Sequence, residues 1–176
     1  EQCGTEATSP DGNNFMFFMG DIDSNRGVQL YQMTDGGVPE EVAMIQALGC
    51  VGGGGRFQYS PDSELFAYIN YEPDAQLADY AQGNLVIRRT NNREVVEDFD
   101  RFEVVAFDLF DGGAIFTYFF TNDRGEAVEA ALNVWDGSSD REFFSVEAQE
   151  GCRYVSSYVK EGAEHFWLVL NERCSG

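Results

Sequence analysis

The sequence predicts an all-β fold built from about four repeated antiparallel sheets. Four apolar runs begin 50, 50 and 51 positions apart, and a fixed period near 50 residues is typical of a repeat architecture. Val, Ile, Phe and Tyr dominate these runs, and Gly or Asp-Gly interrupts the chain at short intervals, which favours strands and tight turns over helices. The runs are Phe15–Met19, Leu65–Ile69, Ile115–Phe120 and Phe166–Leu170.

Each repeat is expected to hold its strands in the same order. An inner strand comes first, an acidic turn leads into the apolar run, and a loop leads to a third and a fourth strand. Inner strands are expected at Arg56–Ser60 and Phe102–Phe107, third strands at Val28–Thr34, Asn84–Thr90 and Ala130–Trp135, and fourth strands near Val42–Leu48, Arg93–Phe99 and Glu142–Glu147. A short helix over Val38–Leu48 is an alternative, because Pro39-Glu40-Glu41 resembles a first helical turn.

The apolar runs do not alternate with polar residues, so their strands are expected to be covered on both faces. Small sheets stacked face to face give this burial, as the blades of a β-propeller do. The single domain 1–176 then divides into repeats at approximately 1–50, 51–100, 101–150 and 151–176. The last repeat holds only a hairpin, so we expect an incomplete propeller. A second copy, another chain or a distorted four-blade ring would complete it.

The chain is strongly acidic, with 31 acidic residues, 11 basic residues and a net charge of −20. Such a surface repels nucleic acid and anionic lipid, since both need cationic side chains to replace their counterions. No apolar run reaches the roughly 18 residues that span a bilayer, so no membrane insertion is expected. The charge suits a cationic partner, a divalent metal or a saline habitat, but solubility alone is the favoured interpretation.

One cysteine pair follows from hairpin geometry. The segment Glu161-Gly162-Ala163-Glu164 is typical of a turn, and folding about position 163 sets Cys152 opposite Cys174, each eleven residues away. Directly opposed strand residues are close enough for a disulfide.

Cys3 and Cys50 occupy comparable places in repeats one and two, so adjacent repeats are expected to bridge there. Two disulfides indicate an oxidising compartment, periplasmic or extracellular. Reduced, buried thiols are the alternative.

The segment Asp21-Ile22-Asp23-Ser24-Asn25-Arg26-Gly27 is the sharpest local motif. Oxygen side chains on Asp21, Asp23 and Asn25 alternate in the way that a calcium loop requires. An EF-hand-type loop, however, needs Gly at the position of Arg26 and a bidentate Glu at that of Gln32. An ordinary turn rich in Asp and Asn is the favoured interpretation, and calcium is the only cofactor that the sequence suggests.

Catalysis finds little support in the sequence. His165 is the only histidine, it lies beside an apolar run, and neither G-x-S-x-G nor H-E-x-x-H occurs. The run Gly52-Gly53-Gly54-Gly55 leads into a strand rather than a helix, so it indicates a connection between repeats and not a phosphate site. The chain is therefore expected not to be an enzyme.

Two segments carry a resemblance to a known family. Ser9-Pro10-Asp11-Gly12-Asn13-Asn14-Phe15-Met16-Phe17-Phe18 and Ser60-Pro61-Asp62-Ser63-Glu64-Leu65-Phe66-Ala67-Tyr68 resemble the turn-and-strand signature of TolB-like, WD-repeat-like propeller repeats. Gln29-Leu30-Tyr31-Gln32-Met33-Thr34-Asp35-Gly36-Gly37 is similar to the segment that follows it in that family. Repeat three keeps only Asp111-Gly112 and Leu132, and repeat four keeps only Glu161-Gly162. These are fold-forming residues rather than chemical groups.

The resemblance implies a rigid platform for protein contacts in a periplasmic or extracellular setting. We therefore expect an exported, non-catalytic binding or scaffold module that meets a protein partner, or itself, through an open blade edge. A calcium-stabilised structural subunit of a surface assembly is one alternative. A hydrolase on a propeller scaffold is the other.

Overall fold

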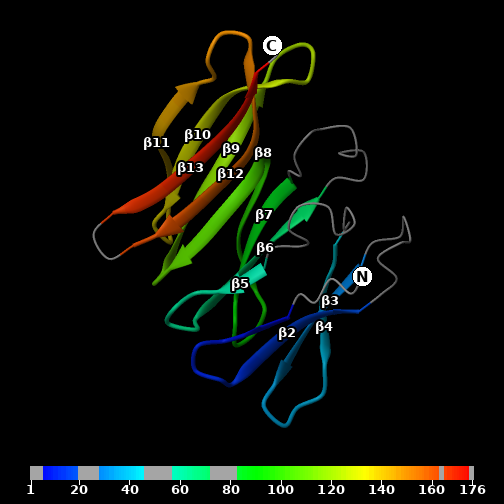
Figure 1. The fold of residues 1–176 in the computed structure, drawn as a ribbon. Helices are drawn as coiled ribbons and strands as arrows, with labels where there is room; N and C mark the ends of the chain where they lie inside the picture. The colour runs from blue at the N-terminus through cyan, green and yellow to red at the C-terminus, as the bar shows by residue number, and fades with distance from the viewer. Residues whose placement is uncertain (1–5, 20–27, 46–56, 72–82, 163–164, 175–176) are drawn as a thin grey trace.

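The computed structural model describes residues 6–19, 28–45, 57–71, 83–162 and 165–174. Within these ranges the chain forms strands β1 to β13 and no helix, and every strand pairing is antiparallel. The strands make three sheets that follow one another along the array (Figure 1). The predicted all-β class is confirmed.

Repeat one forms a four-stranded sheet in chain order. It contains β1 (Glu6–Thr8), β2 (Asn14–Met19), β3 (Val28–Thr34) and β4 (Glu40–Ile45). The third strand has the predicted bounds. The helix considered for this region is not formed between Glu40 and Ile45, where β4 pairs with β3 instead.

Repeats two and three join into one seven-stranded sheet. Separate sheets were expected for these two repeats. Strand β8 joins them, because its first part pairs with β7 and its second part pairs with β9. Two strands, Arg93–Phe99 and Phe102–Phe107, were expected there. No Gly or Pro stands between Val95 and Phe110 to end the strand, so it continues. The strands are β5 (Phe57–Tyr59), β6 (Leu65–Tyr71), β7 (Gly83–Arg89), β8 (Val95–Phe110), β9 (Gly113–Thr121), β10 (Ala127–Trp135) and β11 (Asp140–Glu147).

Repeat four is a hairpin of β12 (Cys152–Glu161) and β13 (Phe166–Cys174) that lies across the face of β8, β9 and β10 (Figure 1). Cys152 stands directly opposite Cys174, and a disulfide of 2.01 Å joins them, so the predicted pair is confirmed.

The acidic turns before β2 and β6 have the same internal hydrogen bonds. In both, the serine hydroxyl donates to the aspartate and accepts a backbone N–H five residues on, at 2.9 Å from Asn14 N to Ser9 and from Leu65 N to Ser60. Gly12 ends the first turn at φ 77°, and Ser63 takes the same place in the second at φ 62°. The Ser63 hydroxyl also accepts the Asp11 N–H at 3.0 Å and so ties the two turns together.

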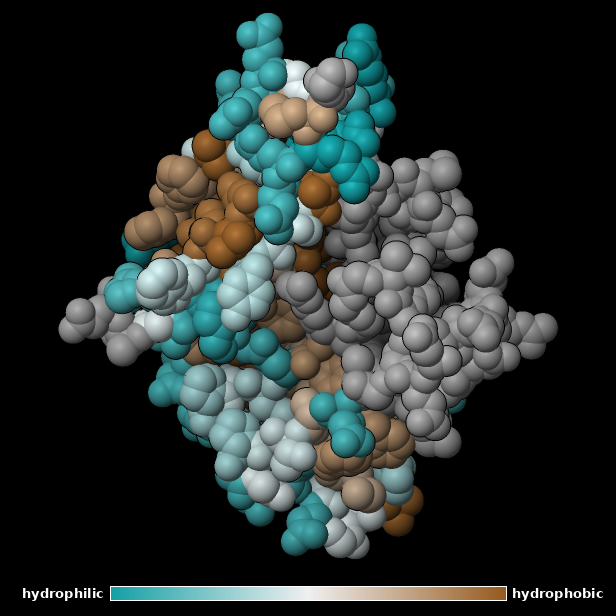
Figure 2. Space-filling model, viewed as in Figure 1, coloured by the Kyte–Doolittle hydropathy of each residue, from teal (hydrophilic) through white to brown (hydrophobic). Residues whose placement is uncertain are grey.

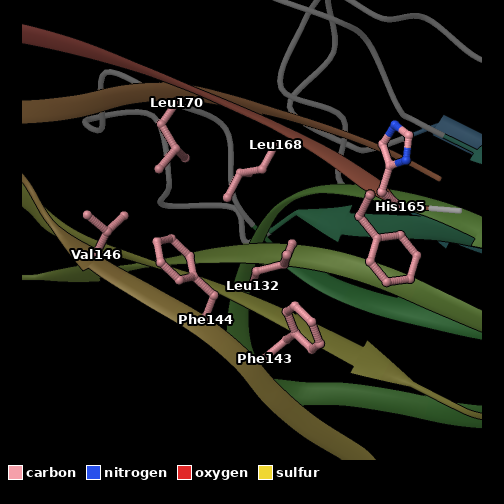
Figure 3. A pocket seen from close by; sticks show the side chains of 8 residues that line it. Leu132, Phe143, Phe144, Val146, His165, Leu168 and Leu170 are labelled. Carbon is pink, nitrogen blue, oxygen red and sulfur yellow. The ribbon is translucent and has the colours of Figure 1, made fainter. Parts of the chain in front are cut away.

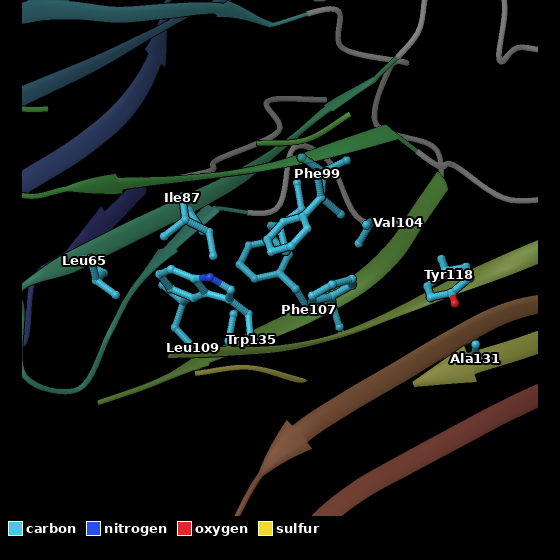
Figure 4. Packing of buried hydrophobic residues seen from close by; sticks show 14 residues of the cluster. Leu65, Ile87, Phe99, Val104, Phe107, Leu109, Tyr118, Ala131 and Trp135 are labelled. Atoms are coloured by element: carbon cyan, nitrogen blue, oxygen red, sulfur yellow. The ribbon is translucent and has the colours of Figure 1, made fainter. Parts of the chain in front are cut away.

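The core lies between neighbouring repeats. Its largest cluster joins β6 and β7 to β8, β9 and β10 (Figure 4). Within it, the rings of Phe99 and Phe116 pack at 4.6 Å between centroids. The run Leu65–Ile69 is buried at every position, as expected for a strand covered on both faces. The run Ile115–Phe120 is buried except at Phe120, which is 43% exposed. In the first run Met16 is buried, whereas Phe15 and Phe17 are half-buried. The last run has one exposed face, because Trp167 and Val169 are 58% and 49% exposed.

A buried carboxylate joins three repeats on the inner strands. Asp108 of β8 accepts hydrogen bonds from the Gln58 amide of β5 at 2.7 Å, from Lys160 Nζ of β12 at 3.0 Å and from the Glu161 N–H at 2.7 Å. Lys160 is the only lysine of the chain. The Asp108 side chain is 4% exposed, so these donors replace the water that an ionised carboxylate requires.

Candidate protein-binding surface

An apolar groove lies between repeats three and four and is a candidate binding site. It runs along β11 on one side and β13 on the other, over β10, with a volume of about 770 Å³. Figure 2 shows apolar side chains gathered on this part of the molecule, with hydrophilic ones around them. We call this site the C-terminal groove; it is lined by Leu132, Phe143, Phe144, Val146, His165, Phe166, Leu168 and Leu170.

A β-bulge shapes the β11 wall of the groove. Phe144 lies opposite Leu132, whereas Glu142 lies opposite Asn133, so Phe143 is the extra residue between them. A bulge turns two consecutive side chains toward one face of a sheet. Phe143 and Phe144 both line the groove as a result (Figure 3), and they remain 60% and 48% exposed.

The β13 wall is formed by alternate residues of the last apolar run. Leu168 and Leu170 point from β13 toward Phe144 and Val146 (Figure 3). The opposite face of the same hairpin carries Trp167 and Val169, with Tyr158 opposite Val169. Tyr158 is 49% exposed. The hairpin is therefore apolar on both faces, and within the described residues only β12 pairs with β13.

The acidic side chains of β11 lie on the face away from the groove. Asp140, Glu142 and Glu147 stand opposite Trp135, Asn133 and Glu129, on the face that packs toward repeat two. Arg141 stands opposite Val134 on the groove face, and Glu172 lies beyond the apolar run on β13. Burial raises the pKa of Tyr118 to about 12, with a further contribution from Glu142, whose carboxylate accepts its hydroxyl at 3.2 Å. Burial also raises the pKa of Tyr154, and the Glu172 carboxylate adds to the rise.

Several predicted site residues cannot be compared with the structure. Asp21, Asp23 and Asn25, the candidate calcium ligands, lie outside the described residues, as do Cys3 and Cys50. Within the described part of the chain, one trio of acidic and cysteine side chains is close enough to share a metal, namely Cys152, Glu172 and Cys174. The two sulfurs are joined in the disulfide, so this trio offers no thiolate ligands.

His165, the only histidine of the sequence, is one of the residues that line the groove (Figure 3). Its ring contacts Trp167 edge-on at 5.1 Å, beside apolar side chains.

Sequence reasoning missed Phe143 and Phe144. The signal was present, because two adjacent aromatic residues among charged ones on an outer strand break the alternation expected of a half-exposed strand.

Comparison with known proteins identifies the fold. No protein-family model matches the chain, and neither does any curated protein. Among solved structures, the β-propeller domain of the Trilobed protease from Pyrococcus furiosus matches 95% of the chain at 14% identity and a TM-score of 0.56. The chain has a β-propeller fold. The propeller is open rather than closed.

Other similar structures include two peptidases. Pyrococcus horikoshii acylaminoacyl peptidase matches 95% of the chain at 12% identity and a TM-score of 0.53, and a prolyl endopeptidase matches 94% at 18% identity and 0.56. The chain spans 53% of the Trilobed protease propeller, 30% of the acylaminoacyl peptidase and 24% of the prolyl endopeptidase. At these identities the similarity concerns the fold alone. No helix among the described residues is long and apolar enough to cross a membrane.

Proposed function

We propose that this chain is an exported, TolB-like propeller module that binds another protein through its C-terminal face and does no catalysis. The C-terminal face consists of the C-terminal groove and the outer face of the hairpin formed by Tyr158, Trp167 and Val169. One observation carries the proposal: the hairpin exposes large apolar side chains on its outer face and lines the apolar groove with half-buried ones on the other. Exposed apolar patches of this kind mark protein contact sites.

Three further features support the proposal. The Cys152–Cys174 disulfide suits an oxidising compartment such as the periplasm or the extracellular space. The Ser-Pro-Asp turns form rigid hydrogen-bonded corners rather than reactive groups. The acidic surface favours association with a cationic protein and disfavours nucleic acid.

Affinity capture with matched variants tests the proposal. Wild-type protein, a Phe143→Ser/Phe144→Ser variant and a Val38→Ser/Val95→Ser control are each used to capture proteins from extracellular and periplasmic fractions. The control also removes two exposed apolar side chains, 80% and 44% exposed, but away from the groove. We expect a partner that the wild type and the control retain and the groove variant loses. Equal recovery by all three proteins would overturn the assignment of this face.

A further inference from the structure

We propose that repeat three binds a linear aliphatic polyamine on the face that packs toward repeat two. The site lies inside the array, between two neighbouring repeats, and on the opposite face of β10 and β11 from the C-terminal groove. It is therefore separate from the C-terminal face. We call it the acidic strip; it consists of Tyr118, Phe120, Glu129, Asn133, Glu142 and Glu147.

The strand register places acceptor groups at both ends of the strip. At one end Glu142 of β11 stands opposite Asn133 of β10. At the other end Glu147 of β11 stands opposite Glu129 of β10, which in turn stands opposite Phe120 of β9. Directly opposed side chains on neighbouring strands lie on the same face, about 5 Å apart at Cβ. Each end therefore combines two oxygen-bearing side chains.

The middle of the strip is formed by small and aromatic side chains. Ala131 of β10 stands between Tyr118 of β9 and Ser145 of β11 (Figure 4). The Tyr118 hydroxyl reaches past Ala131 and donates to the Glu142 carboxylate at 3.2 Å. The Phe120 ring, 43% exposed, contacts the Tyr118 ring edge-on at 4.9 Å between centroids. An exposed aromatic ring beside carboxylates suits an alkyl chain that carries positive charge.

The acidic groups of the strip lack a basic partner. Among the described residues, no ion pair involves Glu129, Glu142 or Glu147, and Arg141, the base of β11, lies on the groove face. Glu129 and Glu147 are like charges directly opposite each other, which destabilises a sheet. Besides burial, the carboxylates of Glu142 and Glu129 raise the pKa of Tyr118, so both ends act on the space between them. A bound cation would relieve this repulsion.

Asn133 is a second and independent observation that points to a ligand. Its side chain is 2% exposed, and its Oδ1 accepts no hydrogen bond from any described residue. A buried acceptor without a donor destabilises the fold, so such groups are rare. Its cross-strand neighbour Glu142 is exposed, and rotation of that side chain admits a donor to Asn133. An ammonium group placed there would donate to the amide oxygen and to the carboxylate together.

The distance between the two ends favours a long cation over a metal ion. Asn133 and Glu129 are four positions apart on β10, which corresponds to about 13 Å. The carboxylates of the strip are described, and no three of them are close enough to share a metal. A lysine side chain carries one ammonium group and would meet only one end. A linear polyamine carries ammonium groups at both ends, joined by methylenes that would lie beside Phe120.

Binding of spermidine to the intact, oxidised protein at low salt tests this inference. Calorimetry measures affinity, and two-dimensional NMR of labelled protein locates the contact. The variants are Glu129→Gln/Glu147→Gln, Asn133→Leu and a control, Glu6→Gln/Asp35→Asn, which also removes two exposed negative charges but in repeat one. Ethylenediamine, magnesium and a blocked Lys-Gly-Lys peptide serve as competing cations.

We expect spermidine to shift amides of β10 and β11. Glu129→Gln/Glu147→Gln should weaken binding about tenfold, whereas the control should match the wild type within about twofold. Ethylenediamine is too short to reach both ends and should bind about tenfold more weakly than spermidine. Asn133→Leu should lower the affinity and raise the melting temperature, since it removes a buried acceptor that has no donor. A purely structural Asn133 would leave the affinity unchanged.

Absence of spermidine binding, shifts confined to other strands, or an equal loss of affinity in the control would overturn the inference. Displacement of spermidine by magnesium at equal ionic strength would show screening of the whole acidic surface and would also overturn it. Tighter binding of the Lys-Gly-Lys peptide at the same amides would assign the strip to a protein partner instead. None of these results bears on capture through Phe143 and Phe144, so the proposed function is tested separately.

Discussion

Replacing Asp108 should loosen the contact between repeats, because its carboxylate holds groups from β5 and β12. In Asp108→Ala the Glu161 N–H and the Gln58 amide each lose a charged acceptor at 2.7 Å. Each such bond contributes about 1.5–3 kcal/mol. The substitution also removes the desolvation cost of a side chain that is 4% exposed, which offsets part of the loss. We expect a net loss of about 3 kcal/mol in the free energy of unfolding.

The partner lysine should matter much less. The Lys160 side chain is 54% exposed, so its ammonium group regains water when the pair is broken. Lys160→Met should therefore cost about 1 kcal/mol or less, as partly exposed ion pairs do. Asp108→Asn keeps one acceptor oxygen and should fall between these two variants.

Urea unfolding of the oxidised proteins, followed by near-ultraviolet circular dichroism, measures these differences. Amide exchange adds a local measurement, since Asp108→Ala should expose the amides at the end of β12 before those of β9. An equal loss in the free energy of unfolding for Lys160→Met and Asp108→Ala would refute the reasoning, because the ion pair would then account for the whole stabilisation by Asp108. A cost for Asp108→Ala below about 0.5 kcal/mol would show that desolvation cancels the hydrogen bonds.

Three further predictions concern the disulfide, the buried phenols and calcium. Replacing both Cys152 and Cys174 by Ser should lower the free energy of unfolding by about 3 kcal/mol, measured by urea unfolding, since the bond closes a loop of sequence separation 22. The raised pKa of Tyr118, about 12 against 10.0 unfolded, means that its stabilising contribution is complete below pH 10 and is lost as the pH rises through 12. Tyr118→Phe should make the decline of melting temperature in that range less steep, and an unchanged slope would contradict it. Millimolar calcium should leave the melting temperature unchanged if residues 21–27 form an ordinary turn, and a marked rise would favour the calcium alternative.

The period and the strand order were predictable from sequence because each depends on local chemistry. The turns at Ser9 and Ser60 recur with the same hydrogen bonds, and each feeds a run of strand-forming residues. The predicted bounds of β3 match the structure, and those of β7 and β10 differ by a few residues at most. The joining of repeats two and three into one sheet was not predicted. It depends on β8 pairing with both β7 and β9, and those contacts are not visible in the local sequence.

The Cys152–Cys174 pair was predicted correctly because the register near the turn and a bulge in β12 shift the pairing in opposite directions. Near the turn, Lys160 lies opposite Trp167, which in a regular ladder would place Cys152 opposite residue 175. The extra residue Val155 on β12 shifts the register by one and brings Cys152 opposite Cys174. Sequence spacing alone supplied the right pair without revealing this bulge. Asp108 was missed for a related reason, because its partners come from two other repeats.

The last apolar run gives the most informative difference between sequence and structure. A strand with one face in water normally carries polar residues on that face, yet β13 is apolar at Trp167 and Val169 as well as at Leu168. The runs of β6 and β9 are likewise mostly apolar, and all their residues except Phe120 are buried. The side chains of β13 therefore suit a strand covered on both sides, although the described residues cover only one. This mismatch is physical support for a contact surface at this end of the array, independent of the volume of the groove.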